Sequence, residues 1–402
     1  MRELFFLPDI PPAAQLPWYA LLLLGAAIAG EAIERWLRLP RLLGWIAVGA
    51  ALGPHALGAL GERSLAALAP LLDLAIGMVL FELGQRVDLT WVWRNPSVLG
   101  ASVAESALSF GLMYAVLAAL EAPPLVAAAA AAIGMATAPA VVLAVTRDLR
   151  SQGQVTERAL LLTALNSAYA VIAVGVLLAW LAREYHGDWR AIVLHPLYLI
   201  FGSLALAAVF ARATLGLLAL LGRRREAQFL CVLALVMIAV WAAASLKLSV
   251  LLALLGYGAA TRLLDRRRLF VSLEFGRLGT ILLILLFALT AASLDWRLLA
   301  AGVFAGAVLL AARLAGKIVG VLAFARLSGL PVRKASLLAL ALAPMSGIAI
   351  VLTHETARLY PQFGASLAAV MLSAIALMEL LGPLLAHFAL VRAGEAAAEA
   401  PA

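Results

Sequence analysis

Long apolar stretches follow one another along the whole chain and are separated by short polar connections. A helix needs about 20 mostly apolar residues to cross a bilayer. By this criterion the sequence predicts an all-α polytopic membrane protein with about 13 transmembrane helices. The predicted segments are 18–34, 42–60, 66–84, 97–119, 124–146, 158–182, 191–221, 227–246, 248–264, 271–292, 298–325, 334–353 and 362–390.

Two of these segments are interrupted in corresponding ways. The fifth reads GMATAPA at 134–140 and the twelfth reads ALAPMSGIA at 341–349, so each has a proline beside small and hydroxyl residues. They are the fifth segments of two six-segment halves on either side of the seventh. Because six is even and one linker follows, the halves enter the membrane in opposite orientations. This pattern is typical of two inverted six-helix repeats whose broken helices cross at an ion or substrate site.

The domain organisation follows from these segments and from the basic residues. Arginines gather in alternate connections, as in GRRRE at 222–226 and GLPVRK at 329–334, which indicates an N-terminus outside and a C-terminus in the cytoplasm. We therefore expect residues 1–17 to be an extracytoplasmic segment and 18–390 a transporter domain, with a cytoplasmic tail at 391–402. Within the domain, 18–182 is the first repeat, 191–221 a linker helix and 227–390 the second repeat. The expected location is the inner (plasma) membrane, in multi-pass form.

Composition agrees with this picture and excludes several classes of protein. With 65% hydrophobic and 13% charged residues, the chain is too apolar for a soluble globular protein. The net charge of +8 does not predict nucleic-acid binding, because basic residues also collect in membrane-protein loops. Cys231 is the single cysteine, and the histidines lack ligand spacing, so we expect no metal, no catalytic residues and no cofactor beyond transported cations and protons.

Five motifs in order resemble the monovalent cation:proton antiporter family, the sodium/proton exchanger-like transmembrane domain, over about residues 20 to 390. They are LLLLGAAIAGEAIERWLRLPRLLGWIAVGAALGPHALG near the start, FELGQRVDL at 81–89, ATAPAVVLAV, LFALTAASLDW at 286–296 and APMSGIAIVL at 343–352. The resemblance implies a sodium/proton antiporter-like fold, exchange of Na⁺ or K⁺ for protons, and a homodimer in the lipid bilayer.

The sequence departs from the family at the ion site. Where the sixth helix of the family carries Asp-Asp or Asn-Asp, this chain has Asn166 and Ser167. The aspartate of the first breakpoint is Ala138, and the Arg and Glu of the second are Met345 and Gly347. The polar groups that remain near the breaks define our predicted ion- or substrate-binding residues: Thr137, Pro139, Asn166, Ser167, Ser346 and Gly347.

Proton exchange needs a group that titrates, and neither asparagine nor serine does so near neutral pH. Carboxylates inside the apolar segments are Asp73, Glu82, Glu105 and Glu379, and such groups are costly in a membrane. Glu105, Asn166 and Lys317 each lie eight residues from the cytoplasmic end of their segment, or about 12 Å deep. Glu105 is the favoured carboxylate. Lys317 aligns with a lysine that some family members pair with an aspartate, and Arg313 is the competing match.

Each candidate for proton coupling also has a purely structural interpretation. Glu105 could be a neutral carboxyl bonding a neighbouring helix, and Asn166 and Ser167 could be packing groups. Lys317 and Arg313 could extend to the membrane surface. If Lys317 is buried, we expect it to lie without an acidic neighbour, partly deprotonated or bonded to Asn166.

The sequence therefore predicts a secondary transporter that resembles monovalent cation:proton antiporters, with alternating access at the crossing of helices 5 and 12. Two alternatives stay open. One is a carrier with the same fold for another, possibly anionic, solute. The other is an antiporter-like protein that has lost proton coupling. No catalytic constellation supports a membrane enzyme.

Overall fold

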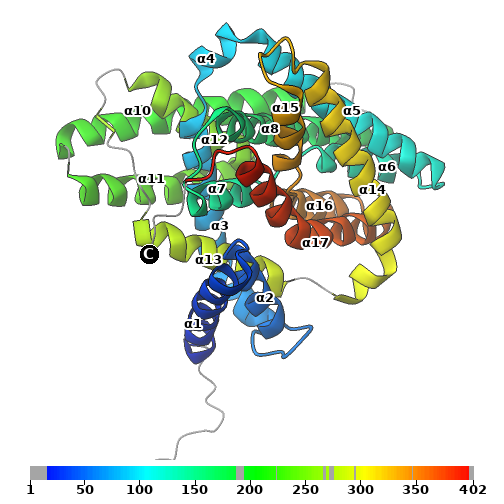
Figure 1. The fold of residues 1–402 in the computed structure, drawn as a ribbon, viewed down its shortest axis with the longest axis horizontal. Coiled ribbons are helices and arrows are strands. Elements are labelled where there is room, and N and C mark those ends of the chain that lie inside the picture. Colours follow the sequence, from blue (N-terminus) through cyan, green and yellow to red (C-terminus); the bar gives the residue numbers. More distant parts are fainter. Residues whose placement is uncertain are drawn as a thin grey trace, which may run out of the picture.

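The computed structural model describes residues 16–186, 194–222, 224–265, 269–270, 276–293, 296–345 and 347–397. All regular structure in these ranges is helical (Figure 1). The helices are α1 Leu16–Ala32, α2 Leu42–Leu52, α3 Glu62–Arg86, α4 Leu89–Arg94, α5 Pro96–Ala119, α6 Pro124–Gly134, α7 Pro139–Asp148, α8 Gln154–His186, α10 Ser203–Leu221, α11 Arg225–Ser245, α12 Val250–Leu264, α13 Gly276–Ala292, α14 Trp296–Ala323, α15 Val332–Ala341, α16 Gly347–Leu359 and α17 Pro361–Arg392. Single π-helical turns occupy Ile33–Leu37 and Tyr198–Gly202.

The predicted segments correspond to this series. Each of them contains a helix, and the fifth and twelfth contain two short helices each, namely α6 with α7 and α15 with α16. In the described part of the chain, 8 helices are long and apolar enough to cross a membrane. The polytopic all-helical fold predicted from the sequence is confirmed.

The two breaks arise where proline follows a small residue. Ala138 precedes Pro139 and has an extended backbone, with φ −74° and ψ 106°. This conformation is favoured before proline because its ring crowds the preceding residue out of the helical region. Pro139 then begins α7, where its missing N–H and fixed φ are compatible with a first helical turn. The short, small-residue sequence thus ends one helix and starts the next within the same span.

Long helices surround the breaks. α14 packs extensively along α5 and α17, α3 packs along α12, and α2 lies between α1 and α13. In Figure 1, α1 and α2 project at one side, whereas α5, α6 and α14 lie at the opposite side from α10 and α11. Of the short helices, α7 packs against α3, α8 and α17, and α15 packs against α8, α14 and α17.

Two glycines bring α14 unusually close to α5. A Cβ atom at Gly316 would lie 2.5 Å from the Cα atom of Ser109, and one at Gly320 would overlap the backbone of Glu105. Small residues four positions apart let membrane helices approach in this way. Lys317 lies between these glycines in the sequence, so the contact places it against α5.

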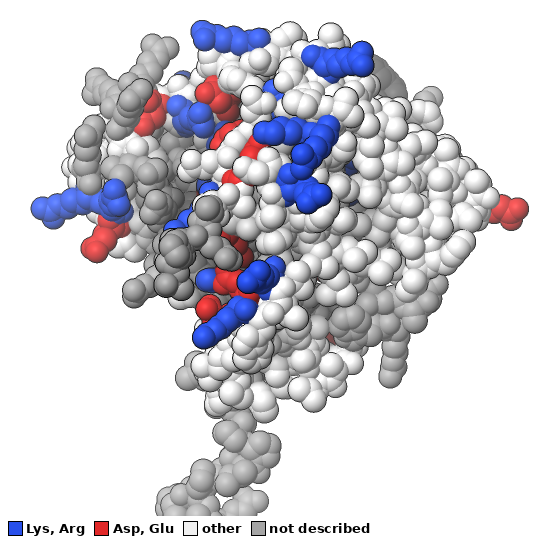
Figure 2. Space-filling model, viewed as in Figure 1, with Lys and Arg blue, Asp and Glu red and all other residues white. Residues whose placement is uncertain are grey.

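The outer surface is mostly uncharged. Figure 2 shows wide areas without Lys, Arg, Asp or Glu, and its charged side chains are gathered in limited regions. Apolar side chains that are exposed here include Trp36, Trp93, Phe304 and Leu220. Such a surface is costly in water and suited to lipid. Many polar side chains, by contrast, are buried, so the interior of the protein contains polar regions.

Candidate functional site

The two broken spans meet at their unwound segments. The backbone N–H of Ala138 donates a hydrogen bond of 2.9 Å to the carbonyl of Pro344. The Thr137 hydroxyl donates to the carbonyl of Leu342 at 3.3 Å. Since these residues lie between α6 and α7 and between α15 and α16, the breaks cross each other. The predicted crossing of broken helices is confirmed.

Arg313, from α14, is bound by the carbonyl oxygens at both breaks. Its Nε donates to Gly134 at 2.6 Å, its Nη1 to Ala343 at 2.5 Å and its Nη2 to Ala136 at 2.8 Å. Carbonyls at a helix C-terminus lack intrahelical partners and carry partial negative charge. A guanidinium has several donors in a fixed plane, so one side chain can serve the C-terminal ends of both α6 and α15.

This location corrects one interpretation of Arg313. The sequence allowed the side chain to extend to the membrane surface, but Arg313 is only 1% exposed. Its charge is directed to backbone carbonyls rather than to solvent. The extended form would have left those carbonyls without partners in an apolar interior, which is costly. Arg313 therefore stabilises the crossing.

A buried ion pair joins α5 and α14. Lys317 Nζ lies 2.9 Å from Glu105 Oε2, and both side chains are fully buried. The second carboxylate oxygen, Glu105 Oε1, accepts no hydrogen bond from the described residues. The expectation that Lys317 lacks an acidic neighbour is wrong, because the close contact of the two helices at Gly316 and Gly320 brings the carboxylate to the ammonium.

Asn166 and Ser167 connect the ion pair's surroundings to the first break. Ser106, next to Glu105, donates to Asn166 Oδ1 at 3.1 Å, and Asn166 Nδ2 donates to the Thr137 hydroxyl at 3.2 Å. Ser167 donates to the carbonyl oxygens of Thr137 at 3.0 Å and Thr163 at 2.8 Å. All of these side chains are buried. The result is a continuous polar path from α5 through α8 to the crossing.

Six of the predicted residues thus meet on one side of the crossing: Thr137, Asn166, Ser167, Glu105, Lys317 and Arg313. The equal depth inferred for Glu105, Asn166 and Lys317 agrees with these contacts. The path offers several oxygen atoms, which hard monovalent and divalent cations prefer as ligands. It also contains one ion pair whose charges balance each other.

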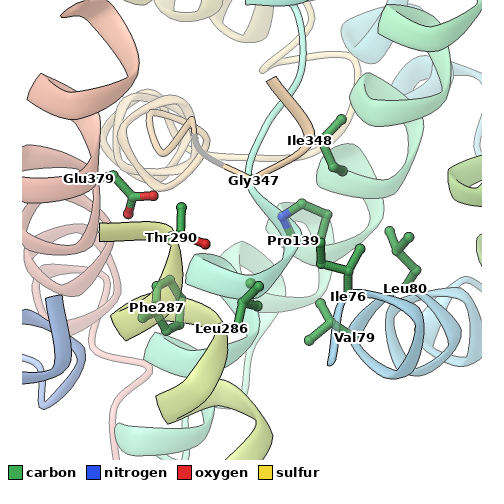
Figure 3. A pocket seen from close by; sticks show the side chains of 11 residues that line it. Ile76, Val79, Leu80, Pro139, Leu286, Phe287, Thr290, Gly347, Ile348 and Glu379 are labelled. Atoms are coloured by element: carbon green, nitrogen blue, oxygen red, sulfur yellow. The ribbon is translucent and has the colours of Figure 1, made fainter. Parts of the chain in front are cut away.

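Pro139 and Gly347 lie at a different place. They begin α7 and α16 and line a cavity of about 30 Å³ with Thr290 and Glu379 (Figure 3). Ser346, the remaining predicted residue, lies outside the described residues. The structure therefore divides the predicted set between two locations.

Glu379 and Ser106 are the polar residues whose place in this region the sequence did not resolve. Glu379 is 1% exposed and is the only charged residue between Arg358 and Arg392. A lone carboxylate in an apolar span is a signal in itself. Ser106 gave no such signal, because a serine inside a membrane helix is common and its partner is 60 positions away.

Comparisons with known proteins find matches to both the sequence and the fold of this chain. The family model described as "Sodium/hydrogen exchanger, transmembrane" matches residues 20–390. The sodium proton antiporter MjNhaP1 from Methanocaldococcus jannaschii, solved at pH 8, is similar with a TM-score of 0.71 and 14% identity, over 95% of this chain and 98% of that one. An electron-microscopy structure of MjNhaP1 gives a TM-score of 0.72 and 14% identity, over 96% and 99%. Among curated proteins, none matches the chain.

Proposed function

Because this chain belongs to the sodium/hydrogen exchanger family, whose members are membrane transporters and not enzymes, we propose that it exchanges Na⁺ or K⁺ for protons. The observation that carries the proposal is the buried pair of Glu105 and Lys317. This pair contains both groups that such an exchange requires, a carboxylate for the cation and an ammonium that can release a proton.

The proposed coupling is a competition for one carboxylate. A cation that reaches Glu105 through its free oxygen Oε1 displaces the Lys317 ammonium. Without its counter-ion, a buried ammonium is unfavourable, so Lys317 loses a proton and becomes a neutral amine. When the cation leaves, Lys317 takes up a proton and the pair forms again. In each direction one positive charge replaces another, so this step exchanges one cation for one proton.

The other predicted residues have supporting roles in this proposal. Asn166, Ser167 and Thr137 supply oxygen atoms and hold the polar path beside Glu105. The helices that cross at the breaks form a bundle that moves against the remaining helices, so that the site opens to each side of the membrane in turn. We further propose a homodimer in the inner membrane with the N-terminus outside, as the arginine distribution indicates.

An anionic solute is less well supported. That alternative depends on an electropositive site. Lys317 is balanced by Glu105, and the donors of Arg313 bind backbone carbonyls. Neither cation is free to bind an anion in this arrangement.

Transport into vesicles tests the proposal. Purified protein is reconstituted with a pH-sensitive dye inside, and pulses of Na⁺, K⁺ or Li⁺ are added against a preset pH gradient. We expect the wild-type protein to collapse the gradient, and Glu105→Gln to reduce the signal to that of empty vesicles. Glu62→Gln, at an exposed carboxylate, is the matched control.

A second variant separates proton release from charge. Lys317→Arg retains a positive charge beside Glu105, but a guanidinium does not deprotonate in proteins. We therefore expect Lys317→Arg to fold and to lose exchange. Normal exchange in Lys317→Arg or in Glu105→Gln would contradict the proposal, as would absence of exchange by the wild-type protein with all three cations.

A further inference from the structure

A second buried carboxylate lies at the crossing, on the side where the half-helices begin. Glu379, on α17, is 1% exposed, and neither of its carboxylate oxygens has a hydrogen-bond partner among the described residues. It lines the same cavity as Pro139 and Gly347, the first residues of α7 and α16. Figure 3 shows its carboxyl group directed toward the Thr290 side chain of α13. The ion pair described above does not involve this carboxylate.

Two features of the surroundings of Glu379 act on its charge in opposite directions. The first backbone N–H groups of a helix lack intrahelical partners and carry partial positive charge. At α16, and at α7 after Pro139, which has no N–H, such groups favour a carboxylate in this cavity. The rest of the lining is mostly apolar, with Ile76, Leu286 and Phe287 among its side chains, and burial there disfavours charge. When these effects nearly balance, a small change in water access decides between the two forms.

Charged groups on the neighbouring helices do not determine the charge state of Glu379. The other residues that line the cavity carry no charge. Arg313 is bound to carbonyls, Lys317 to Glu105, Arg147 to Glu82 and Lys334 to Glu395. Among the side chains that the structure describes on the packed elements α3, α7, α13, α14, α15, α16 and α17, the remaining titratable or charged ones are not part of the cavity lining: Glu62, Arg63, Asp73, Arg86, Asp148, Arg333, His354, Glu355, Arg358, His387 and Arg392.

The size and chemistry of the cavity identify its ligand. A water molecule needs roughly 10–15 Å³ of such space, so about 30 Å³ holds one or two waters. Thr290 and Glu379 are the lining residues with side-chain oxygens. A dehydrated metal cation usually needs several oxygen ligands, and the nearby helix N-termini repel positive charge. A proton needs only the carboxylate and a water to carry it.

We propose that Glu379 is a second proton-binding site, with Thr290 beside it, which takes up and releases a proton at the N-terminal ends of α7 and α16 as water reaches the cavity. The step is a simple acid dissociation: the Glu379 O–H bond breaks, its electron pair stays on the carboxylate, and a water molecule takes the proton. This site adds to the proposed exchange at Glu105 and Lys317. It gives the transport cycle one proton more than that pair supplies.

Infrared spectroscopy of purified protein tests the site without any transport. A protonated carboxyl absorbs in a region separate from carboxylates, and the band disappears on deprotonation. We expect a band in wild-type protein that titrates with pH, is absent in Glu379→Gln, persists in Glu105→Gln and shifts its titration in Thr290→Val. A spectrum in which Glu379→Gln leaves every titrating carboxyl band unchanged would overturn the proposal. If Glu379→Gln does not fold, Glu379→Asp must move the band, and an unmoved band would likewise overturn the proposal.

The proton count gives a second, independent result. In vesicles, the effect of a membrane potential on the exchange reports the protons moved per cation, because an exchange of one proton for one cation moves no net charge. We expect Glu379→Gln to lower this ratio by one proton while cation exchange continues, and an unchanged ratio would overturn the second proton. Failure of all transport by the wild-type protein would contradict the proposed antiport alone, because the infrared titration does not depend on it.

Discussion

Lys317 and Glu105 show how strongly a single pair of side chains depends on both partners. Two charges in an apolar interior each lose the hydration that they have in water, and their attraction compensates only while both are present. Removal of one partner leaves a buried charge without compensation. Removal of both side chains leaves no buried charge, so the double substitution destabilises the protein less than the removal of one partner alone.

We therefore predict that Lys317→Met lowers stability by about 3–5 kcal/mol and that adding Glu105→Gln restores much of this loss. Thermal unfolding of detergent-solubilised protein, followed by circular dichroism, measures the effect. Lys247→Met, at an exposed lysine, is the control. Additive destabilisation in the double variant would show that the two side chains are not energetically coupled.

A second residue, Glu395, fixes the segment after α17. Its carboxylate accepts hydrogen bonds from the backbone N–H groups of Val155 at 3.0 Å and Thr156 at 2.8 Å, and from the Thr156 hydroxyl at 3.0 Å. These are donors of the first turn of α8, which a negative group satisfies well. Lys334 Nζ lies 3.3 Å from the Oε1 atom of the same carboxylate.

Stability should depend on pH through this carboxylate. Burial by itself raises the pKa of Glu395, but the hydrogen bonds from Val155, Thr156 and Lys334 outweigh it and hold the pKa below its ordinary value. A lowered pKa in the folded state stabilises the protein above the unfolded-state pKa, and this contribution is lost as pH falls through the folded value.

We predict that Glu395→Gln is less stable than wild type by about 1–2 kcal/mol at neutral pH. The difference should shrink as pH falls below about 4, where the wild-type carboxylate takes up its proton. Melting temperatures of both proteins between neutral and acidic pH measure this. A difference that stays constant through the acidic range would contradict the role assigned to the Glu395 charge.

At the scale of whole elements, the contact of α14 with α5 decides where the charged groups meet. Gly316 and Gly320 remove the side chains that would separate the two helices. Hydrogen bonding supports the same contact, because the Ser109 hydroxyl donates to the carbonyl of Arg313 at 3.3 Å. The helix interface therefore sets the Lys317–Glu105 distance.

We predict that Gly320→Ala moves α14 away from α5 and reduces exchange in vesicles by at least about tenfold, since small displacements at a transport site are costly. The added methyl group would overlap the backbone of Glu105. Gly111→Ala, also on α5, is the control, because a Cβ atom there meets nothing within 4 Å. Equal exchange by both variants would show that the helix spacing is not critical.

At the scale of the molecule, the arginine distribution predicts the orientation in the membrane. Leu57 lies between α2 and α3, and Leu327 lies between α14 and α15. Both are exposed, at 74% and 73%, and the two connections are predicted to face opposite sides. With Cys231→Ala as background, a membrane-impermeant thiol reagent added to intact cells should label Leu57→Cys and not Leu327→Cys. Labelling after lysis checks that both cysteines are reactive. The reverse pattern would invert the proposed topology.

The sequence by itself determined the helical segments, their order and the two breaks, because these depend on local properties. Apolar length decides which segments can span a bilayer, and Pro139 and Pro344 interrupt the helices in which they occur. Counting residues along straight helices also predicted that Glu105, Asn166 and Lys317 lie at a similar level. Family membership was predictable for the same reason, since its motifs are contiguous.

The tertiary structure alone decided which buried polar groups are partners. Whether Lys317 meets Glu105 depends on the rotation and spacing of α5 and α14, and these two residues are 212 positions apart in the chain. Likewise, Arg313 could be assigned to the carbonyls of both breaks only after the breaks were brought together. Glu379 acquired its place at the helix N-termini in the same way. Such lateral contacts are fixed by packing between helices, which no local pattern of residues contains.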